Sequence, residues 1–379
     1  MTFYEKIQKR NKLFKAINAF CFPLFKAIRY FRKSADSKSD KTLIILLHKI
    51  GDTIFTIPAV ITLRKEIKNQ VFILCYQHSE YLYKLFIPNI TCVLVSRDDF
   101  YFKFRIAKKY IREKINSIDP NSIFDLTGEC NSASIILYSK AHYIAGFNKD
   151  IFEGIYDSFS KIESEKHLIL RYLNFIELFF NKKISLTHSF QSKKKQNIEN
   201  IFIHPFAGWK SKEWGFKKFI AIGLFLSIEY KVSFIIPTES EYREYLEILK
   251  ENKIRYFLSD SIPVLIDLLK QCDLFIGNDS GPLYVANILG CATFSIYGPT
   301  NPRYSIPFGK SHNYISKNVK CSAGYNSQMC FTNGGRDGCP SYECMNLLPV
   351  HEVQSKLISF INELNYMAET NNVTLEVQN

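Results

Sequence analysis

Short apolar runs of strand length alternate with helix-like segments along most of the 379-residue chain. In the first half, five runs are expected to form strands: Thr42–His48, Val71–Tyr76, Cys92–Ser96, Ser122–Leu126 and His142–Phe147. Apolar strands separated by helices are typical of a parallel sheet with both faces covered. The pattern therefore predicts an α/β domain over residues 42–190.

A second alternating set follows a lysine-rich stretch, Gln191–Asn197, which we interpret as a linker within a hinge at 185–198. Its expected strands are Asn200–Pro205, Lys231–Pro237, Leu274–Asn278 and Ala292–Gly298. This predicts a second Rossmann-like domain over 191–350, then a C-terminal helix and tail over 351–379 that ends in a polar segment from Ala368. Two such domains are expected to turn their parallel sheets toward a central cleft, with ligands at the carboxyl ends of the strands.

The N-terminal 41 residues differ from the rest in charge. They hold eleven Lys or Arg against three acidic residues, an excess of +8, so the other 338 residues carry only +5 of the formal +13. Apolar residues recur there at near-helical spacing, with Pro23 expected to interrupt them: Phe3, Ile7, Phe14, Ile17, Phe20, then Phe25, Ile28 and Phe31. The pattern favours a basic amphipathic leader, residues 1–41, on an anionic membrane surface. The alternatives are a disordered basic leader without a partner, or a nucleic-acid arm, although no recognition fold follows it.

Composition bounds the class of protein. Hydrophobic residues make up 46% and charged residues 22%, as in ordinary globular proteins. No apolar run approaches the roughly 20 residues that span a bilayer, and no cleavable signal sequence is visible. Six of the ten cysteines are scattered through the first 300 residues. These features indicate a protein of the reducing cytoplasm.

The turn Asn278-Asp279-Ser280-Gly281 is the clearest candidate site. It follows an apolar strand and opens a helix that continues to Leu289. Asp279 and Ser280 suit the N-cap, and Gly281 lets the backbone approach a ligand closely. A helix start of this kind attracts a diphosphate through its N–H groups and dipole. The alternative is an ordinary capped helix without a ligand.

Three further positions follow predicted strands and carry possible chemistry. Asp52, between Gly51 and Thr53, can act as a general base or can cap the helix behind it. Lys212, near Lys210 and Trp214, can stabilise a leaving diphosphate or be a solvated lysine. Glu239 and Glu241 can bind a ribose hydroxyl or simply favour the first turn of a helix.

Four cysteines cluster late in the chain, in a long segment rich in Gly, Asn and Ser: Cys321, Cys330, Cys339 and Cys344. Four thiolates can close a structural zinc site, but no C-x2-C pair is present. A metal site, disulfide or redox pairing, and unliganded thiols all remain open from the sequence.

Three segments, in order, resemble glycosyltransferase family 9, the ADP-heptose:lipopolysaccharide heptosyltransferases. They are Leu46–Lys65, with a Gly-Asp loop and a Leu-Arg helix; Ile201–Phe219, with a His-Pro strand end and a Lys-x-Trp pair; and Leu274–Pro302. Asp125–Phe147 is a weaker match. The resemblance covers roughly residues 42–365.

The resemblance implies an inverting enzyme of the GT-B type that moves a heptose, or a related sugar, from an ADP-sugar to the lipopolysaccharide inner core. Asp52 would be the general base, in the half that binds the acceptor. In the half that binds the donor, Lys212 would contact the diphosphate, and Lys210 is a less specific candidate for that contact. Glu241 would contact the ribose. No cofactor besides the donor is implied, and the place of work is cytoplasmic, peripheral to the inner membrane.

This chain departs from the family pattern at two places. Tyr284 stands where the family usually has a histidine, and Ala207 and Gly208 replace hydroxyl residues before the lysine. The other function classes compatible with the sequence are a sugar-nucleotide epimerase of the same fold and a non-catalytic binding protein of membranes or nucleic acid.

Overall fold

The computed structural model describes residues 3–33, 39–102, 105–148, 150–161, 166–184, 197–309, 311–324, 327–330, 339 and 341–376. The chain divides into two compact units, Phe3–Ile184 and Ser185–Asn379. Unit 1 and unit 2 below refer to these two ranges.

Unit 1 is built on a six-stranded sheet with the order β3-β2-β1-β6-β7-β8, and its neighbouring strands pair in parallel. The strands are β1 Lys41–Leu46, β2 Gln70–Tyr76, β3 Thr91–Val95, β6 Ser122–Asp125, β7 Tyr143–Asn148 and β8 Ser158–Lys161; β4 Phe100–Tyr101 and β5 Ile106–Ala107 form a separate hairpin. The helices are α1 Phe3–Arg32, α2 Ile50–Glu66, α3 Gln77–Phe86, α4 Lys109–Ile118, α5 Cys130–Ile136 and α6 Leu168–Phe180, with short 3-10 turns η1 Arg97–Asp99 and η2 Asp150–Ile155.

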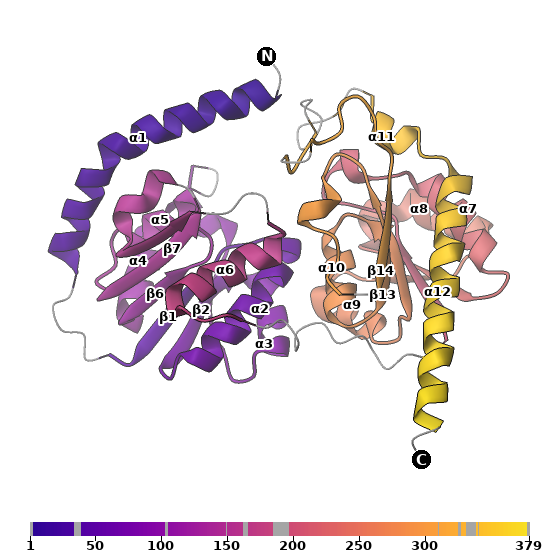
Figure 1. Ribbon diagram of the computed structural model, residues 1–379, viewed down its shortest axis with the longest axis horizontal. Helices are drawn as coiled ribbons and strands as arrows, with labels where there is room; N and C mark the ends of the chain where they lie inside the picture. The colour runs from indigo at the N-terminus through magenta and orange to yellow at the C-terminus, as the bar shows by residue number, and fades with distance from the viewer. Residues whose placement is uncertain are drawn as a thin grey trace. The chain divides into compact units, whose positions relative to one another are not determined.

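The sheet of unit 1 is buried on both faces. Helices α2, α3 and α6 pack together on one face, and α4 and α5 lie on the other (Figure 1). Every residue of β1 from Thr42 onward is buried, which explains its continuous apolar sequence. The strand order reverses between β1 and β6, so loops at their carboxyl ends diverge and leave room for a ligand.

Helix α1 is a folded part of unit 1. It continues through Pro23, with a bend but no break (Figure 1), because a proline disturbs only the local hydrogen bond of an exposed helix face. The sequence predicted an interruption there, which is wrong. One face of α1 packs against η2, where Phe25 joins the core cluster that contains Ile155 and Tyr156.

Unit 2 repeats the architecture with the strand order β11-β10-β9-β12-β13-β14, again paired in parallel. The strands are β9 Asn200–His204, β10 Lys231–Ile236, β11 Tyr256–Leu258, β12 Leu274–Asn278, β13 Ala292–Tyr297 and β14 His312–Ser316. The helices are α7 Phe216–Leu226, α8 Glu239–Glu251, α9 Ile262–Leu269, α10 Gly281–Ile288, α11 Glu343–Asn346 and α12 Val350–Glu376, with η3 Lys210–Lys212 and η4 Pro302–Tyr304.

A single large core holds unit 2 together. The central strands supply fully buried residues such as Ile203, Phe234 and Phe294, and α12 adds Leu357 and Phe360. Helix α12 runs to Glu376, so most of the segment from Ala368, expected to be a polar tail, is helical. None of the described helices is both long enough and apolar enough to cross a membrane.

All nine predicted strands are present, each within two residues of its predicted bounds at either end. Five of the described strands were missed: the two-residue strands β4 and β5 of the hairpin, and β8, β11 and β14. The last three lie at the edges of their sheets, where partial exposure weakens the apolar pattern.

Candidate functional site

The candidate donor site lies at the carboxyl ends of β9 and β12, the two strands between which the order of the unit 2 sheet reverses. Gly277 pairs with His204 at this point, and a Cβ on Gly277 would lie 2.9 Å from the His204 carbonyl oxygen. The glycine therefore permits the close approach of the two strands. The loop after β9 carries η3, and the turn after β12 leads into α10.

Asn278 joins the segments around this point. Its side-chain amide donates to the Pro205 carbonyl oxygen at 2.7 Å, and its Oδ1 accepts from the Trp214 backbone N–H at 3.1 Å. The Trp214 side chain is 2% exposed, and its indole N–H donates to the Leu348 carbonyl oxygen at 2.9 Å. The tryptophan of the Lys-x-Trp pair is thus an anchor that holds the loop of Lys212 beside α10.

Lys212 forms a buried ion pair with Asp279. Its Nζ lies 2.5 Å from Asp279 Oδ2, and the two side chains are 15% and 4% exposed. The ammonium also stands over the Trp209 ring, 4.6 Å from its centroid. The carboxylate orients the lysine, so a cationic group is held in one position next to the start of α10.

Asp279 does not cap α10. Besides Lys212, it accepts hydrogen bonds from the Thr300 hydroxyl at 2.6 Å and from the Tyr284 hydroxyl. Burial raises the pKa of Asp279. The charge of Lys212 and these hydrogen bonds lower this pKa by more than burial raises it, so it lies below the ordinary value. Asp279 is therefore a charged group whose oxygens are occupied by protein donors.

Ser280 is the N-cap of α10, and its side chain forms no capping hydrogen bond. The residue is 7% exposed, and its Oγ is buried without a hydrogen-bond partner among the described residues. A buried, unpartnered hydroxyl at a helix N-terminus is available to an anionic ligand that binds there. Gly281 begins the helix and Pro282 fixes its first turn.

The Tyr284 hydroxyl faces inward, toward the protein. It donates to Asp279 and lies 3.4 Å from the Tyr297 hydroxyl, and the residue is 5% exposed. Burial and the neighbouring carboxylate raise the pKa of Tyr284 well above its ordinary value, so it stays protonated. In this structure the Tyr284 hydroxyl supports the Asp279 carboxylate.

Lys210 and the acidic pair of α8 lie at the surface. Lys210 is 70% exposed and pairs with Glu213 at 2.7 Å, which raises its pKa. Glu239 and Glu241 are exposed in the first turn of α8, directly after β10. The N-cap Thr238 has a buried Oγ1 without a hydrogen-bond partner among the described residues, a feature that sequence reasoning missed.

In unit 1, Asp52 lies in the first turn of α2 and is exposed. The helix begins at Ile50 with Lys49 as its N-cap, so Asp52 is not a cap. No hydrogen bond or ion pair from the described residues reaches its carboxylate. Gly51 is an ordinary helical residue, and the buried Thr53 hydroxyl bonds to Ser79 at 2.9 Å, a packing role.

Two histidines near Asp52 were not singled out from the sequence. His48 Nε2 lies 3.0 Å from the Leu126 carbonyl oxygen, and His78 Nε2 lies 3.0 Å from the His48 carbonyl oxygen. Burial lowers the pKa of His48, against the opposing charge of Asp52. His48 is the last residue of one strand predicted from the sequence, and His78 follows the next one, so their place at strand ends was the signal that could have found them.

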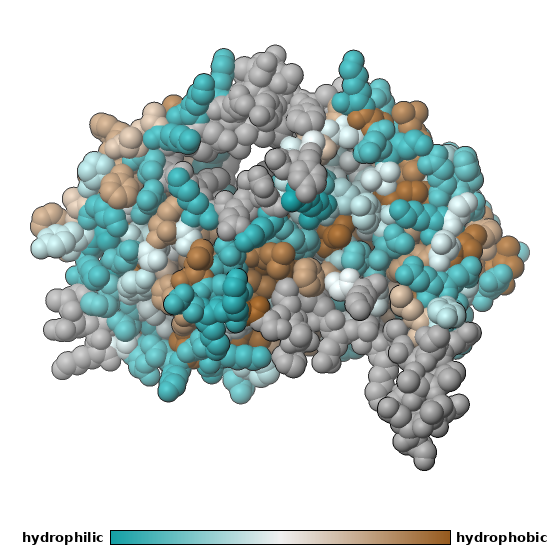
Figure 2. Space-filling view, in the orientation of Figure 1, coloured by the Kyte–Doolittle hydropathy of each residue, from teal (hydrophilic) through white to brown (hydrophobic). Residues whose placement is uncertain are grey.

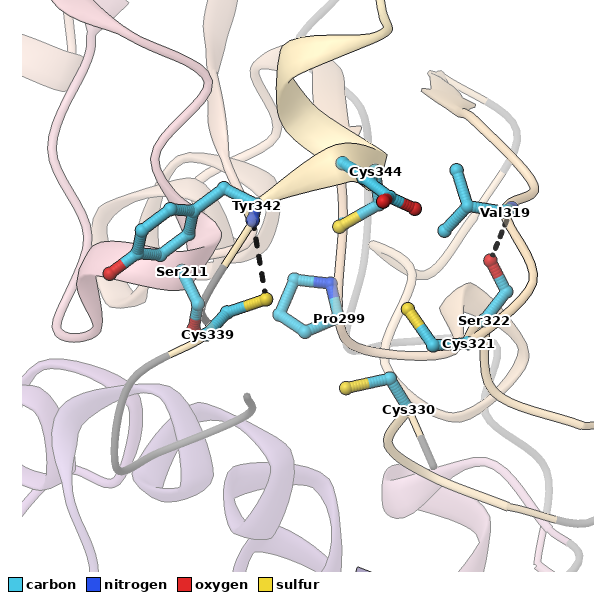
Figure 3. Close-up of a pocket in the computed structure, with 11 residues that line it drawn as sticks. Ser211, Pro299, Val319, Cys321, Ser322, Cys330, Cys339, Tyr342 and Cys344 are labelled. Carbon is cyan, nitrogen blue, oxygen red and sulfur yellow. Dashed lines mark hydrogen bonds between the residues drawn. The ribbon is translucent and has the colours of Figure 1, made fainter. Parts of the chain in front are cut away.

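The four late cysteines line one pocket of unit 2 together with Ser211, Pro299 and Tyr342, and Figure 3 shows them around Pro299. Cys339 Sγ accepts from the Tyr342 backbone N–H at 3.3 Å, and burial with the neighbouring thiols raises the pKa of Cys344 to about 11. All ten cysteines are thiols. Within the described ranges, no group of three or more His, Cys, Asp or Glu side chains is arranged to hold a metal ion.

Comparison with known proteins identifies the family. The model of glycosyltransferase family 9 (heptosyltransferase) matches residues 111–333. Lipooligosaccharide heptosyltransferase 2 of Campylobacter jejuni subsp. jejuni serotype O:6 is 26% identical over 276 residues, which cover 68% of this chain and 82% of that protein.

Solved structures show the fold. E. coli ADP-heptose LPS heptosyltransferase II matches with a TM-score of 0.63 at 14% identity, over 85% of this chain and 99% of that one. E. coli heptosyltransferase WaaC with ADP-2-deoxy-2-fluoro heptose matches with a TM-score of 0.62 at 15% identity, over 84% and 99%. The two Rossmann-like units are thus those of a GT-B fold. Because the family model matches more than half of the chain, this protein is a glycosyltransferase and belongs to family 9.

Proposed function

We propose that this enzyme transfers a heptose from ADP-heptose to the lipopolysaccharide inner core, with inversion at the anomeric carbon. The observation that carries the proposal is the pairing of an oriented lysine with the N-terminus of α10, where Ser280 offers a buried hydroxyl without a protein partner. A cation and a helix start together suit a diphosphate whose charge grows as it leaves.

The proposed chemistry needs one base and one site for the leaving group. The acceptor hydroxyl oxygen attacks the anomeric carbon, its proton passes to the Asp52 carboxylate, and the bond from that carbon to the diphosphate oxygen breaks. Lys212 and the first turn of α10 meet the negative charge that develops on ADP. These groups neutralise the diphosphate without any further cofactor in the proposed mechanism.

The choice of sugar nucleotide and acceptor rests on the relatives. The E. coli structure is named for an ADP-linked heptose analogue, and the Campylobacter relative is named as a lipooligosaccharide heptosyltransferase. In unit 2, Thr238 and Glu241 follow β10, next to β9, where a ribose contact belongs in a Rossmann-like domain. We place the enzyme at the cytoplasmic face of the inner membrane, where such an acceptor would be available.

Ser280→Ala is the sharpest test of the donor site. Since the Ser280 hydroxyl makes no hydrogen bond within the described protein, its removal should leave the melting temperature of the ligand-free enzyme unchanged. Loss of a hydrogen bond to a charged phosphate should weaken ADP binding at least about tenfold. Thermal shifts with ADP, UDP and GDP measure this, because a ligand at a hundredfold excess over Kd stabilises by about 2.7 kcal/mol.

Lys217→Ala is the matched control, since Lys217 is an exposed lysine in the first turn of α7. It should bind ADP like the wild type. If no nucleoside diphosphate stabilises the wild type, the donor site is misassigned. If UDP stabilises it as strongly as ADP, the choice of ADP-heptose is wrong. Transfer of heptose to an isolated inner-core acceptor, with the product anomer determined by NMR, then tests the reaction and its stereochemistry.

A further inference from the structure

Helix α1 has an inner face that packs against the rest of unit 1 and an exposed apolar face. Positions 18, 22, 25 and 29 lie on one face and are partly or fully buried against the rest of unit 1. The opposite face carries four large apolar side chains that are exposed: Leu13 (58%), Phe20 (80%), Leu24 (53%) and Phe31 (83%). Their spacings of seven, four and seven residues place them on one stripe of a helix with 3.6 residues per turn. We call these four residues the outer stripe.

The inner face of α1 is firmly docked. Arg29, 5% exposed, donates from Nε and Nη2 to Asp157 Oδ2 at 3.2 and 2.7 Å, and from Nη2 to the His142 carbonyl oxygen at 3.0 Å. Lys26 Nζ donates to the Tyr156 carbonyl oxygen at 2.7 Å. These contacts prevent the helix from rolling, so the outer stripe keeps a fixed direction relative to the unit 1 sheet.

Gly154 adds a second, independent sign of close docking. A Cβ at this position of η2 would lie 2.7 Å from the Phe22 carbonyl oxygen and 2.9 Å from Phe25 Cβ. A glycine there allows the helix backbone to approach at a distance that a side chain would forbid. The α1–η2 contact is therefore part of the packed unit.

The charge around the outer stripe indicates what covers it. Residues 3–32 contain eight Lys or Arg and one acid, Glu5. Lys9, Lys12, Lys15 and Arg32 are exposed, and Figure 2 shows apolar and hydrophilic side chains side by side along the α1 edge of unit 1. A second copy of this helix would bring like charges together, which is unfavourable. An anionic lipid surface satisfies both the apolar stripe and the basic side chains.

We propose that α1 is a docked membrane-contact helix: its inner face is fixed to unit 1, and its outer stripe inserts into the interfacial region of an anionic leaflet. The helix then sets the orientation of unit 1 at the membrane as well as binding it there. This inference rests on the proposed function only in that a lipid-linked acceptor would lie in the same leaflet. Binding itself requires no substrate.

Vesicle sedimentation of the full chain tests the contact. Wild type should partition onto vesicles of phosphatidylcholine with 30% phosphatidylglycerol at low salt, and much less onto phosphatidylcholine alone. The double variant Phe20→Ser, Phe31→Ser should lose at least about tenfold in partition coefficient, because two inserted aromatic side chains are removed. Its melting temperature should not fall, since both side chains are exposed in the folded protein.

Ile228→Ser is the matched control, because Ile228 is 80% exposed, like Phe20, but belongs to unit 2. It should partition like the wild type. The proposal is overturned if wild type ignores anionic vesicles at low salt, or if the double variant sediments as the wild type does. It is also overturned if light scattering shows a wild-type dimer that the double variant abolishes, since a second copy would then cover the stripe.

Tryptophan fluorescence tests the fixed orientation. Phe20→Trp should show a blue shift on anionic vesicles, because the ring leaves water, whereas Phe25→Trp on the inner face should not change. Equal shifts at both positions would mean that α1 leaves unit 1, and would refute the docked arrangement. All these readouts are independent of the donor assay, so failure of the ADP-heptose assignment and failure of this proposal are distinguishable.

Discussion

At the scale of single residues, the donor site depends on a chain of buried polar contacts. Tyr284 and Thr300 hold Asp279, and Asp279 holds Lys212. Each contact satisfies a group that would be costly to bury alone. The same carboxylate therefore has a structural task and, in the proposed mechanism, positions the lysine that meets the leaving group. The effects of substituting any of these four residues should therefore be measured on stability as well as on activity.

Lys212→Ala should lower kcat at least about a hundredfold, because the cation that meets the leaving diphosphate is lost. It also leaves the buried Asp279 carboxylate without its ion pair, which should destabilise unit 2. Steady-state kinetics together with urea denaturation separate the two effects. Lys210→Ala, which removes an exposed lysine paired with Glu213, should change neither quantity much. Equal kinetic losses in the two variants would contradict the assignment of Lys212.

Asp52→Asn should lose at least about a hundredfold in turnover while ADP binding stays normal, because only proton removal from the acceptor is affected. Stability should be retained, since no described protein group bonds to this carboxylate. Glu113→Gln, at an exposed acid of α4, provides a control of the same charge change. Retention of most activity by Asp52→Asn would remove Asp52 from the proposed mechanism.

His204 makes unit 2 sensitive to mild acid. The residue is 6% exposed, and burial lowers its pKa to about 4, whereas an unfolded histidine has a pKa near 6.5. Between these values the unfolded chain binds more protons, so stability should fall as pH drops from about 6.5 to about 4, by about 3 kcal/mol in total. Urea denaturation at several pH values measures the slope.

His204→Phe should flatten that slope by removing the titrating group while keeping a ring between Phe206 and Phe275. His351→Gln, at an exposed histidine of α12, should leave it unchanged. An unaltered slope in His204→Phe would show that other groups cause the acid sensitivity.

At the scale of elements, α1 is the largest departure from what the N-terminal sequence suggested. It was expected to be a leader separate from the two domains. Its inner face instead covers η2 and pairs with Asp157. Burial opposes ionisation of Asp157, yet Arg29 holds its pKa below the ordinary value. The helix therefore contributes to the stability of unit 1.

Arg29→Met should destabilise the protein by about 2 kcal/mol, because it leaves Asp157 and the His142 carbonyl group without their charged donor. Lys33→Met is the matched control, since Lys33 is 35% exposed and lies 3.4 Å from the same carboxylate. It should cost well under 1 kcal/mol. Chemical denaturation measures the free energy of unfolding of both variants. Equal small effects would mean that α1 docking contributes little, and removal of residues 1–33 would then be harmless.

At the scale of the whole molecule, each unit has its own core and its own candidate groups. Unit 2 contains the proposed diphosphate site, and unit 1 contains Asp52 and the membrane-contact helix. This separation predicts that a nucleotide and a membrane act on different parts of the chain.

Hydrogen exchange of the full chain should localise these effects. ADP should slow exchange in peptides that contain the α10 start and the Lys212 loop, while anionic vesicles without nucleotide should slow exchange in α1. Peptides from α12 serve as an internal control for ADP, since α12 lies outside the proposed site. ADP protection confined to unit 1 would contradict the donor assignment.

The local sequence by itself determined nine of the described strands, the order of the motifs and the family. Apolar runs flanked by loops identify buried parallel strands, and functional residues follow their carboxyl ends because the fold places ligands there. Asp52, Lys212 and the 278–281 turn are the candidates that this reasoning selected. The edge strands β8, β11 and β14 escaped it because they are only partly buried.

Only the tertiary structure decided what the polar side chains contact. Asp279 suits an N-cap locally, but a lysine 67 residues earlier in the chain binds its carboxylate, and Ser280 is left available for a ligand. Arg29 pairs with a carboxylate 128 residues away, which turns one face of a basic helix inward. Partners so distant in sequence leave no periodic signal, because they are brought together by the packing of separate elements around a core.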